Sequence, residues 1–352
     1  MTPVRKSFLA LLLAALACAG CAVRPPPGAL YGAPPAAAQV ADRALEDRIL
    51  ALDPDRVTAA DVRQTLVRGP TPRIMLLHGG IYPVHLSMES FGNFLVAMGY
   101  PEARIRDPRD GSWSHSPYTD ADQLAGMLAW YYEKDGMPPM LIGHSQGGMQ
   151  AVKVLYVLDG YYEAPVRVWN PMTDQAEPRT SFKDPLTGRE TPVVHGFKVV
   201  YASAVGAGGA AFLLPNQWAM IGKLHTIPDT IEEFTGYAIA LDLWAWTVPG
   251  VDATARFENG GKVHVRNVTL PAANNHVLIP VTADLAGMPF VREWIDAYVP
   301  GTTIAPPADS GENVLWAADV WYSVKKYWVI EAQRLIRARR AVPRAAVAGK
   351  LE

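Results

Sequence analysis

A serine between two glycines, in the segment LIGHSQGG, is the side chain of this sequence best placed to do chemistry. Residues 140–142 predict the end of a buried strand, and residues 150–158 predict a helix with one apolar face. A strand that turns into a helix so quickly needs a sharp corner, and Gly143 and Gly147 would let neighbouring backbone approach closely there. The hydroxyl of Ser145 would point out of this corner and could act as a nucleophile.

A serine hydroxyl needs a base to take its proton and fixed donors to stabilise the oxyanion that follows. A second motif, HGG at residues 78–80, follows a short apolar strand predicted at 74–77. With this motif and GHSQGG at 143–148, the chain resembles the α/β-hydrolase superfamily, particularly its lipase and esterase members, over residues 70–300. The resemblance implies the α/β-hydrolase fold. The alternation of predicted strands and helices from residue 73 likewise indicates a mostly parallel sheet with helices on both faces, and a break in this pattern indicates an inserted excursion after the helix that follows the serine.

The same resemblance implies where an oxyanion would be held. One donor is the backbone N–H of Gln146, and the second comes from the loop after the first strand, near Gly80 or Ile81. Backbone donors suit this task because they are fixed before negative charge develops. His78 precedes these donors, so we expect it to orient the loop rather than to act as the base.

The order serine, acid, histidine in this family implies a base late in the chain. We expect His276, which lies in a polar loop after a predicted strand. The other downstream histidines are less suitable, since His195 and His225 precede strands and His264 lies within one.

For the acid, position suggests two aspartates. Asp242 interrupts the apolar run YAIALDLWAW, whereas Asp252 follows a Pro-Gly pair. We favour Asp242 because a buried carboxylate needs a partner, which a histidine would supply.

No motif predicts a cofactor, a metal or nucleic acid. The chain lacks H-E-x-x-H and paired Cys/His spacings, and AVGAGGAA at 204–211 lacks the G-x-G-x-x-G pattern, which favours a close-packed loop after a strand. The net charge is -2, and no stripe of Lys/Arg with interleaved aromatics is present in the body of the chain.

The N-terminus predicts export. Arg5 and Lys6 precede an apolar run over residues 8–19 that is too short to span a bilayer, so residues 1–21 are interpreted as a signal peptide. Cys18-Ala19-Gly20-Cys21 resembles a bacterial lipobox, although Cys18 stands where leucine is usual. We therefore expect a lipid anchor on Cys21 and a membrane-anchored lipoprotein of the cell envelope; signal cleavage without lipidation, giving a periplasmic or secreted protein, is the alternative.

The remaining pattern predicts one α/β-hydrolase domain over residues 41–340, between a Pro/Ala-rich tether at 22–40 and a C-terminal tail at 341–352. A helical lead-in covers 41–68, and residues 161–195 form an insertion, with a hairpin, that we expect over the site. The other expected elements are helices at 88–98, 290–298, 314–340 and from the Thr119/Asp120 cap to Gly136, and strands at 103–106, 197–205, 237–246 and 262–270. The aromatic face of the last helix is expected to dock on the core rather than on a membrane.

The function that the resemblance implies is hydrolysis of carboxylic esters, of small molecules or of lipids, through an acyl-enzyme on Ser145. Three kinds of enzyme with the same triad remain as alternatives: an acyltransferase, a thioesterase or an amidase. A non-catalytic envelope binding protein with this fold is the alternative from another class.

Overall fold

The computed structural model describes residues 42–208, 215–240, 242, 245, 256–271, 275–302 and 304–341. Within these ranges a parallel sheet of five strands forms the centre of the molecule, in the order β1-β2-β7-β9-β11. The strands are β1 (Ile74–Leu77), β2 (Met140–His144), β7 (Val199–Val205), β9 (Ile231–Ile239) and β11 (His264–Leu270). The predicted α/β class and its parallel sheet are confirmed. The expected signal peptide, tether and nearly all of the C-terminal tail lie outside the described residues.

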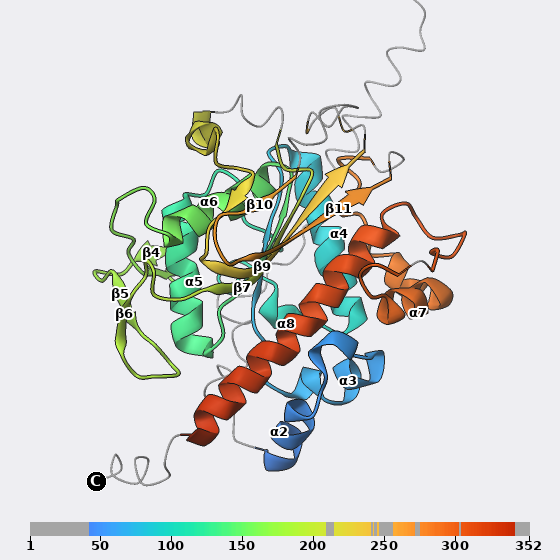
Figure 1. Ribbon diagram of the computed structural model, residues 1–352, viewed down its shortest axis with the longest axis horizontal. Coiled ribbons are helices and arrows are strands. Elements are labelled where there is room, and N and C mark those ends of the chain that lie inside the picture. Colours follow the sequence, from blue (N-terminus) through green and yellow to red (C-terminus); the bar gives the residue numbers. More distant parts are fainter. Residues whose placement is uncertain are drawn as a thin grey trace, which may run out of the picture.

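Helices cover both faces of the sheet (Figure 1). Alternate residues of a strand point to opposite faces, so Ile74 and Leu76 join one apolar core while Met75 and Leu77 join the other. The first core is completed by α2 (Arg43–Leu50), α3 (Ala59–Gln64), α4 (Tyr82–Met98), α7 (Pro289–Ala297) and α8 (Val314–Ala341). The second is completed by α5 (Ala121–Asp135) and α6 (Gln146–Leu158).

The last helix, α8, runs across the first face of the sheet. Its predicted docking face is confirmed, because Trp321, Val324 and Trp328 are buried in the first core and Leu335 is buried in a small cluster with Met137. In the described part of the chain, no helix has the length and apolarity that crossing a membrane requires.

Two predicted strands are wrong in position or type. Residues 103–106 are not a strand, because a 3-10 turn (η5, Glu102–Arg104) forms there and Arg104 reaches the buried carboxylate of Asp135 at 2.9 Å. The strand expected at 237–246 begins earlier and ends earlier, as β9 (Ile231–Ile239). The acidic residues Glu232 and Glu233 at its start obscured this strand in the sequence. Glu233 is nevertheless buried, and its carboxylate accepts from the hydroxyl of Tyr327 on α8 at 2.9 Å and lies 3.5 Å from Nε of Arg266.

The insertion at 161–195 forms two hairpins, β3 (Trp169–Asn170) with β4 (Gln175–Ala176), and β5 (Ser181–Lys183) with β6 (Glu190–Pro192). The predicted hairpin is confirmed, but its expected place over the site is wrong. The segment packs against α5 (Figure 1), where Arg179 forms a bidentate pair with Glu133 at 2.7 and 2.8 Å. Gly126 of α5 allows this approach, since a Cβ there would lie 2.2 Å from the carbonyl oxygen of Arg167.

Short elements complete the described chain. They are η3 (Pro54–Arg56), η4 (Leu66–Arg68), η7 (Pro215–Met220), η9 (Leu285–Gly287), β8 (Thr226–Ile227) and β10 (Glu258–Asn259). Because all five central strands are parallel, the loops that follow them meet at one edge of the sheet.

Candidate active site

Ser145 occupies the corner between β2 and α6, and its backbone is strained. Its φ is 55° and its ψ is -125°, a conformation that L-residues adopt only when their surroundings impose it. The surroundings here include β7, because the N–H of Ser145 donates to the carbonyl of Val205 at 2.8 Å.

The two motif glycines are required by close backbone contact. A Cβ on Gly147 would lie 2.2 Å from the carbonyl oxygen of Leu77 at the end of β1, and one on Gly143 would lie 2.5 Å from the carbonyl oxygen of Gly147. The start of α6 therefore lies directly against the ends of β1 and β2, as predicted for a tight strand-to-helix corner. Any side chain at either position would push the helix away and move Ser145.

The structure brings Ser145, His276 and Asp242 into one hydrogen-bonded chain. Nε2 of His276 lies 2.9 Å from Oγ of Ser145, and Nδ1 lies 2.5 Å from Oδ2 of Asp242. The carboxylate can only accept, so Nδ1 carries a proton and Nε2 of the neutral ring is left to accept the serine proton. The side chains of Asp242 and His276 are 1% and 9% exposed, so the pair is largely shielded from water. Such an arrangement can draw a proton from the hydroxyl and hold the imidazolium that results.

Asp242 is placed by the loop after β9. Its N–H contacts the carbonyl of Ile239 at 3.3 Å, and its Oδ1 accepts from the N–H of Ala245 at 3.2 Å. The alternative acid, Asp252, lies outside the described residues.

Gly206 lies directly against the ring of His276. It was not identified as a site residue from the sequence. Its φ is 60°, and a Cβ there would lie 2.9 Å from both Nδ1 and Cε1 of His276 and 3.4 Å from Oδ2 of Asp242. The expected close-packed loop after a strand is confirmed. The signal was the glycine run itself, but nothing in the sequence indicated what packs on it.

The loop expected to supply the second oxyanion donor lies against Ser145 and Gln146. A Cβ on Gly79 would contact the Cβ of Ser145 at 3.0 Å, and one on Gly80 would lie 2.1 Å from Oε1 of Gln146. Gln146 is the first residue of α6, where backbone N–H groups have no acceptor within the helix. Ile81 is the residue before α4, one position further along the same loop.

His78 and His144 both contact carbonyl groups of site loops. Nδ1 of His78 lies 2.7 Å from the carbonyl oxygen of Gly79, and burial is the main cause that lowers its pKa, so it fits the expected loop-orienting role. His144 was not singled out from the sequence. Its Nε2 lies 2.7 Å from the carbonyl oxygen of His276, and burial is the main cause that lowers its pKa to about 3.

The other downstream histidines lie away from Ser145. His264 is on an exposed face of β11 beside Glu233, as expected of a residue within a strand. His225 contacts the ring of Phe257, and His195 packs at Gly160 after α6.

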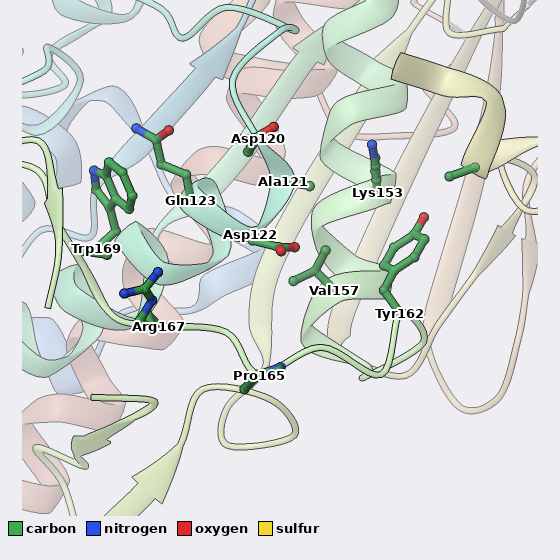
Figure 2. Close-up of a pocket in the computed structure, with 12 residues that line it drawn as sticks. Asp120, Ala121, Asp122, Gln123, Lys153, Val157, Tyr162, Pro165, Arg167 and Trp169 are labelled. Atoms are coloured by element: carbon green, nitrogen blue, oxygen red, sulfur yellow. The ribbon is translucent and has the colours of Figure 1, made fainter. Parts of the chain in front are cut away.

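A separate pocket of about 470 Å³ lies further along α6 (Figure 2). Lys153 and Val157 line it from α6, Asp122 from α5, and Trp169 from the insertion. It includes none of the three hydrogen-bonded residues. No group of three or more His, Cys, Asp or Glu suited to a metal ion occurs among the described residues.

Neither a protein-family model nor a curated protein matches this chain.

Proposed function

We propose that this protein is a serine hydrolase of the α/β-hydrolase type that cleaves carboxylic esters through an acyl-enzyme on Ser145. The observation that carries the proposal is the chain Ser145–His276–Asp242, with contacts of 2.9 and 2.5 Å. The strained backbone at Ser145 supports it, as does the loop of Gly79 and Gly80, which lies against Ser145 and Gln146 and carries candidate oxyanion donors. The order of the three residues along the chain, and their place on loops at one edge of a parallel sheet, fit the same fold.

The proposed reaction has two halves. Oγ of Ser145 attacks the ester carbonyl while Nε2 of His276 takes the hydroxyl proton, and the carbonyl oxygen becomes an oxyanion beside Gln146 and Gly80. The oxyanion collapses, the C–O bond to the alcohol breaks, and His276 gives the proton to the leaving alkoxide. A water then attacks the acyl group with His276 again as base, which releases the acid and restores the serine.

Exposed apolar side chains around the site support an ester with an apolar part. Ile81 and Leu86 lie at the start of α4, and Leu278 lies two residues after His276; each is half exposed or more. Tyr118 and Trp218 belong to the same surroundings. Tyr118 reaches Gly80, while Trp218 lies on η7, which is joined to Gln146 through Asn216. An ester with an apolar acyl chain would cover these groups and remove their surface from water.

Labelling with a fluorophosphonate probe tests the proposal, because only an activated serine reacts. We expect the wild type to label and to hydrolyse p-nitrophenyl esters, with chain-length preference read from a graded series. Ser145→Ala should abolish labelling and lower turnover by several orders of magnitude, on the order of 10⁶ in a serine protease. Ser181→Ala, in a hairpin on α5, is the matched control and should label normally. An unlabelled wild type would contradict the proposal and favour a non-catalytic binding protein.

We also propose that the mature protein is exported and anchored through lipid on Cys21, on the basis of its N-terminal sequence. Cys21→Ala should move the protein from the membrane fraction to the soluble fraction. An intact mass that corresponds to an unmodified N-terminus beyond residue 21 would show secretion without an anchor.

A further inference from the structure

His144, the last residue of β2, is fully buried directly before Ser145. Its Nε2 lies 2.7 Å from the backbone carbonyl oxygen of His276, and the two imidazole rings are 5.1 Å apart. This contact joins the strand that carries the nucleophile to the loop that carries the base, across 132 residues of sequence.

The contact fixes the protonation state of the His144 ring. A carbonyl oxygen only accepts, so Nε2 must carry the proton and Nδ1 of the neutral ring must be bare. Nδ1 is buried and has no hydrogen-bond partner among the described residues. A second proton would therefore place an unpaired cation in a buried site, beside the ring that becomes an imidazolium during the proposed reaction.

A bare buried nitrogen has a cost for folding that an apolar side chain of similar size would avoid. The same ring, however, contacts the carbonyl oxygen of His276 through Nε2, a hydrogen bond that an apolar side chain could not make. It sets the backbone of His276, and through it the ring whose Nε2 must stay within reach of Ser145.

We propose that His144 is a positioning residue for the base: as a neutral Nε2–H donor to the carbonyl of His276, it holds the imidazole in line between Ser145 and Asp242. This inference depends on the proposed hydrolase function of the same site. In this role His144 acts through His276 and does not contact the substrate.

Two substitutions separate positioning from simple core filling. His144→Met fills the space and removes the donor, whereas His144→Gln places an amide N–H near the position of Nε2. We expect His144→Met to keep or raise the unfolding temperature and to lower kcat about 10²-fold with little change in KM, the size of loss that a misplacement near 1 Å causes. His144→Gln should recover most of kcat. The rate of fluorophosphonate labelling should change in parallel.

NMR of the ring nitrogens of the wild type tests the same inference without any activity. We expect the Nε2–H tautomer of His144 and no titration of its ring between pH 5 and 8. An Nδ1–H tautomer, or titration in that interval, would overturn the positioning role.

The kinetic outcomes distinguish the two proposals. If the wild type labels and His144→Met has the kcat of the wild type, His144 only fills space. If Met and Gln lower kcat equally, the donor is not the cause, and the inference is wrong while the hydrolase proposal stands. If the wild type itself does not label, the proposed function fails, and the positioning role fails with it.

Discussion

Replacing Gly206 by alanine should impair the proposed reaction without removing any hydrogen-bonding group. The added Cβ would lie 2.9 Å from Nδ1 and Cε1 of His276, whereas ordinary van der Waals contact begins at 3.4 Å. The ring must therefore move by about 0.5 Å. Since a misplacement of 1 Å can cost about 10²-fold in rate, we expect kcat/KM to fall about 10-fold.

The same substitution also has a cost in the backbone. Gly206 has a φ of 60°, so alanine there should lose about 1–2 kcal/mol of unfolding free energy from the left-handed conformation alone. Gly188 gives a matched control, because its φ is 72° and a Cβ there would meet nothing within 4 Å. Gly188→Ala should therefore lose similar stability and no activity.

Urea unfolding of both variants, with kcat/KM on a p-nitrophenyl ester and the rate of fluorophosphonate labelling, provides the comparison. Equal activity of Gly206→Ala and Gly188→Ala would refute the reasoning, since the contact with His276 would then have no effect on the chemistry. A large loss in both would attribute the effect to stability rather than to the site.

Three further predictions follow from charged groups. Asp242→Asn should lower kcat about 10⁴-fold with the fold intact, because His276 would lose the carboxylate that orients it and balances its charge. Asp252→Asn should have almost no effect on kcat. If steady-state kinetics show the larger loss of kcat for Asp252→Asn, the role belongs to Asp252. Burial raises the pKa of Glu331 from 4.5 to about 7, so stability should be lost as pH rises through this interval, by about 3 kcal/mol. In urea unfolding, Glu331→Gln should reduce the loss of unfolding free energy with rising pH. An unchanged pH dependence of the unfolding free energy would contradict this prediction. Asp319→Asn should cost about 1.5–3 kcal/mol of unfolding free energy, because Arg266 would lose the carboxylate that it contacts at 2.7 and 2.9 Å and keep, among the described residues, only that of Glu233, 3.5 Å from its Nε. A loss under about 1 kcal/mol would contradict this prediction.

Sequence patterns predicted the elements whose partners lie nearby in the chain. The apolar run at 74–77, the corner at Ser145 and the glycine that ends α4 each follow from local rules of periodicity, close packing and left-handed backbone. They failed where a distant partner decides the outcome. Glu233 is buried in a strand beside partners from α8 and β11, and Arg104 in the 3-10 turn pairs with Asp135 of α5.

The site divides in the same way. Ser145 came from a local motif, and His276 and Asp242 came from the order that the family resemblance implies, together with the cost of burying an unpaired carboxylate. These three hydrogen-bonded residues could therefore be named before the fold was known. Gly206 and His144 could not be named, because each acts on a residue of another loop. For Gly206 that contact is with the ring of His276, and for His144 it is with the backbone carbonyl of His276.

Both missed residues follow from the order of the strands. Ser145 leaves β2 and His276 follows β11, and in the sheet β7 and β9 lie between these two strands. Nε2 of His276 lies 2.9 Å from Oγ of Ser145, so the ring of His276 lies beyond the ends of both intervening strands. This ring needs space at the ends of the strands, and Gly206, which directly follows β7, leaves that space because it has no side chain. The backbone of His276 also needs a contact on the side of β2. His144, the last residue of β2, provides it through the contact of its Nε2 with the carbonyl oxygen of His276. The residues at both positions are thus constrained by the placement of His276, independently of the substrate.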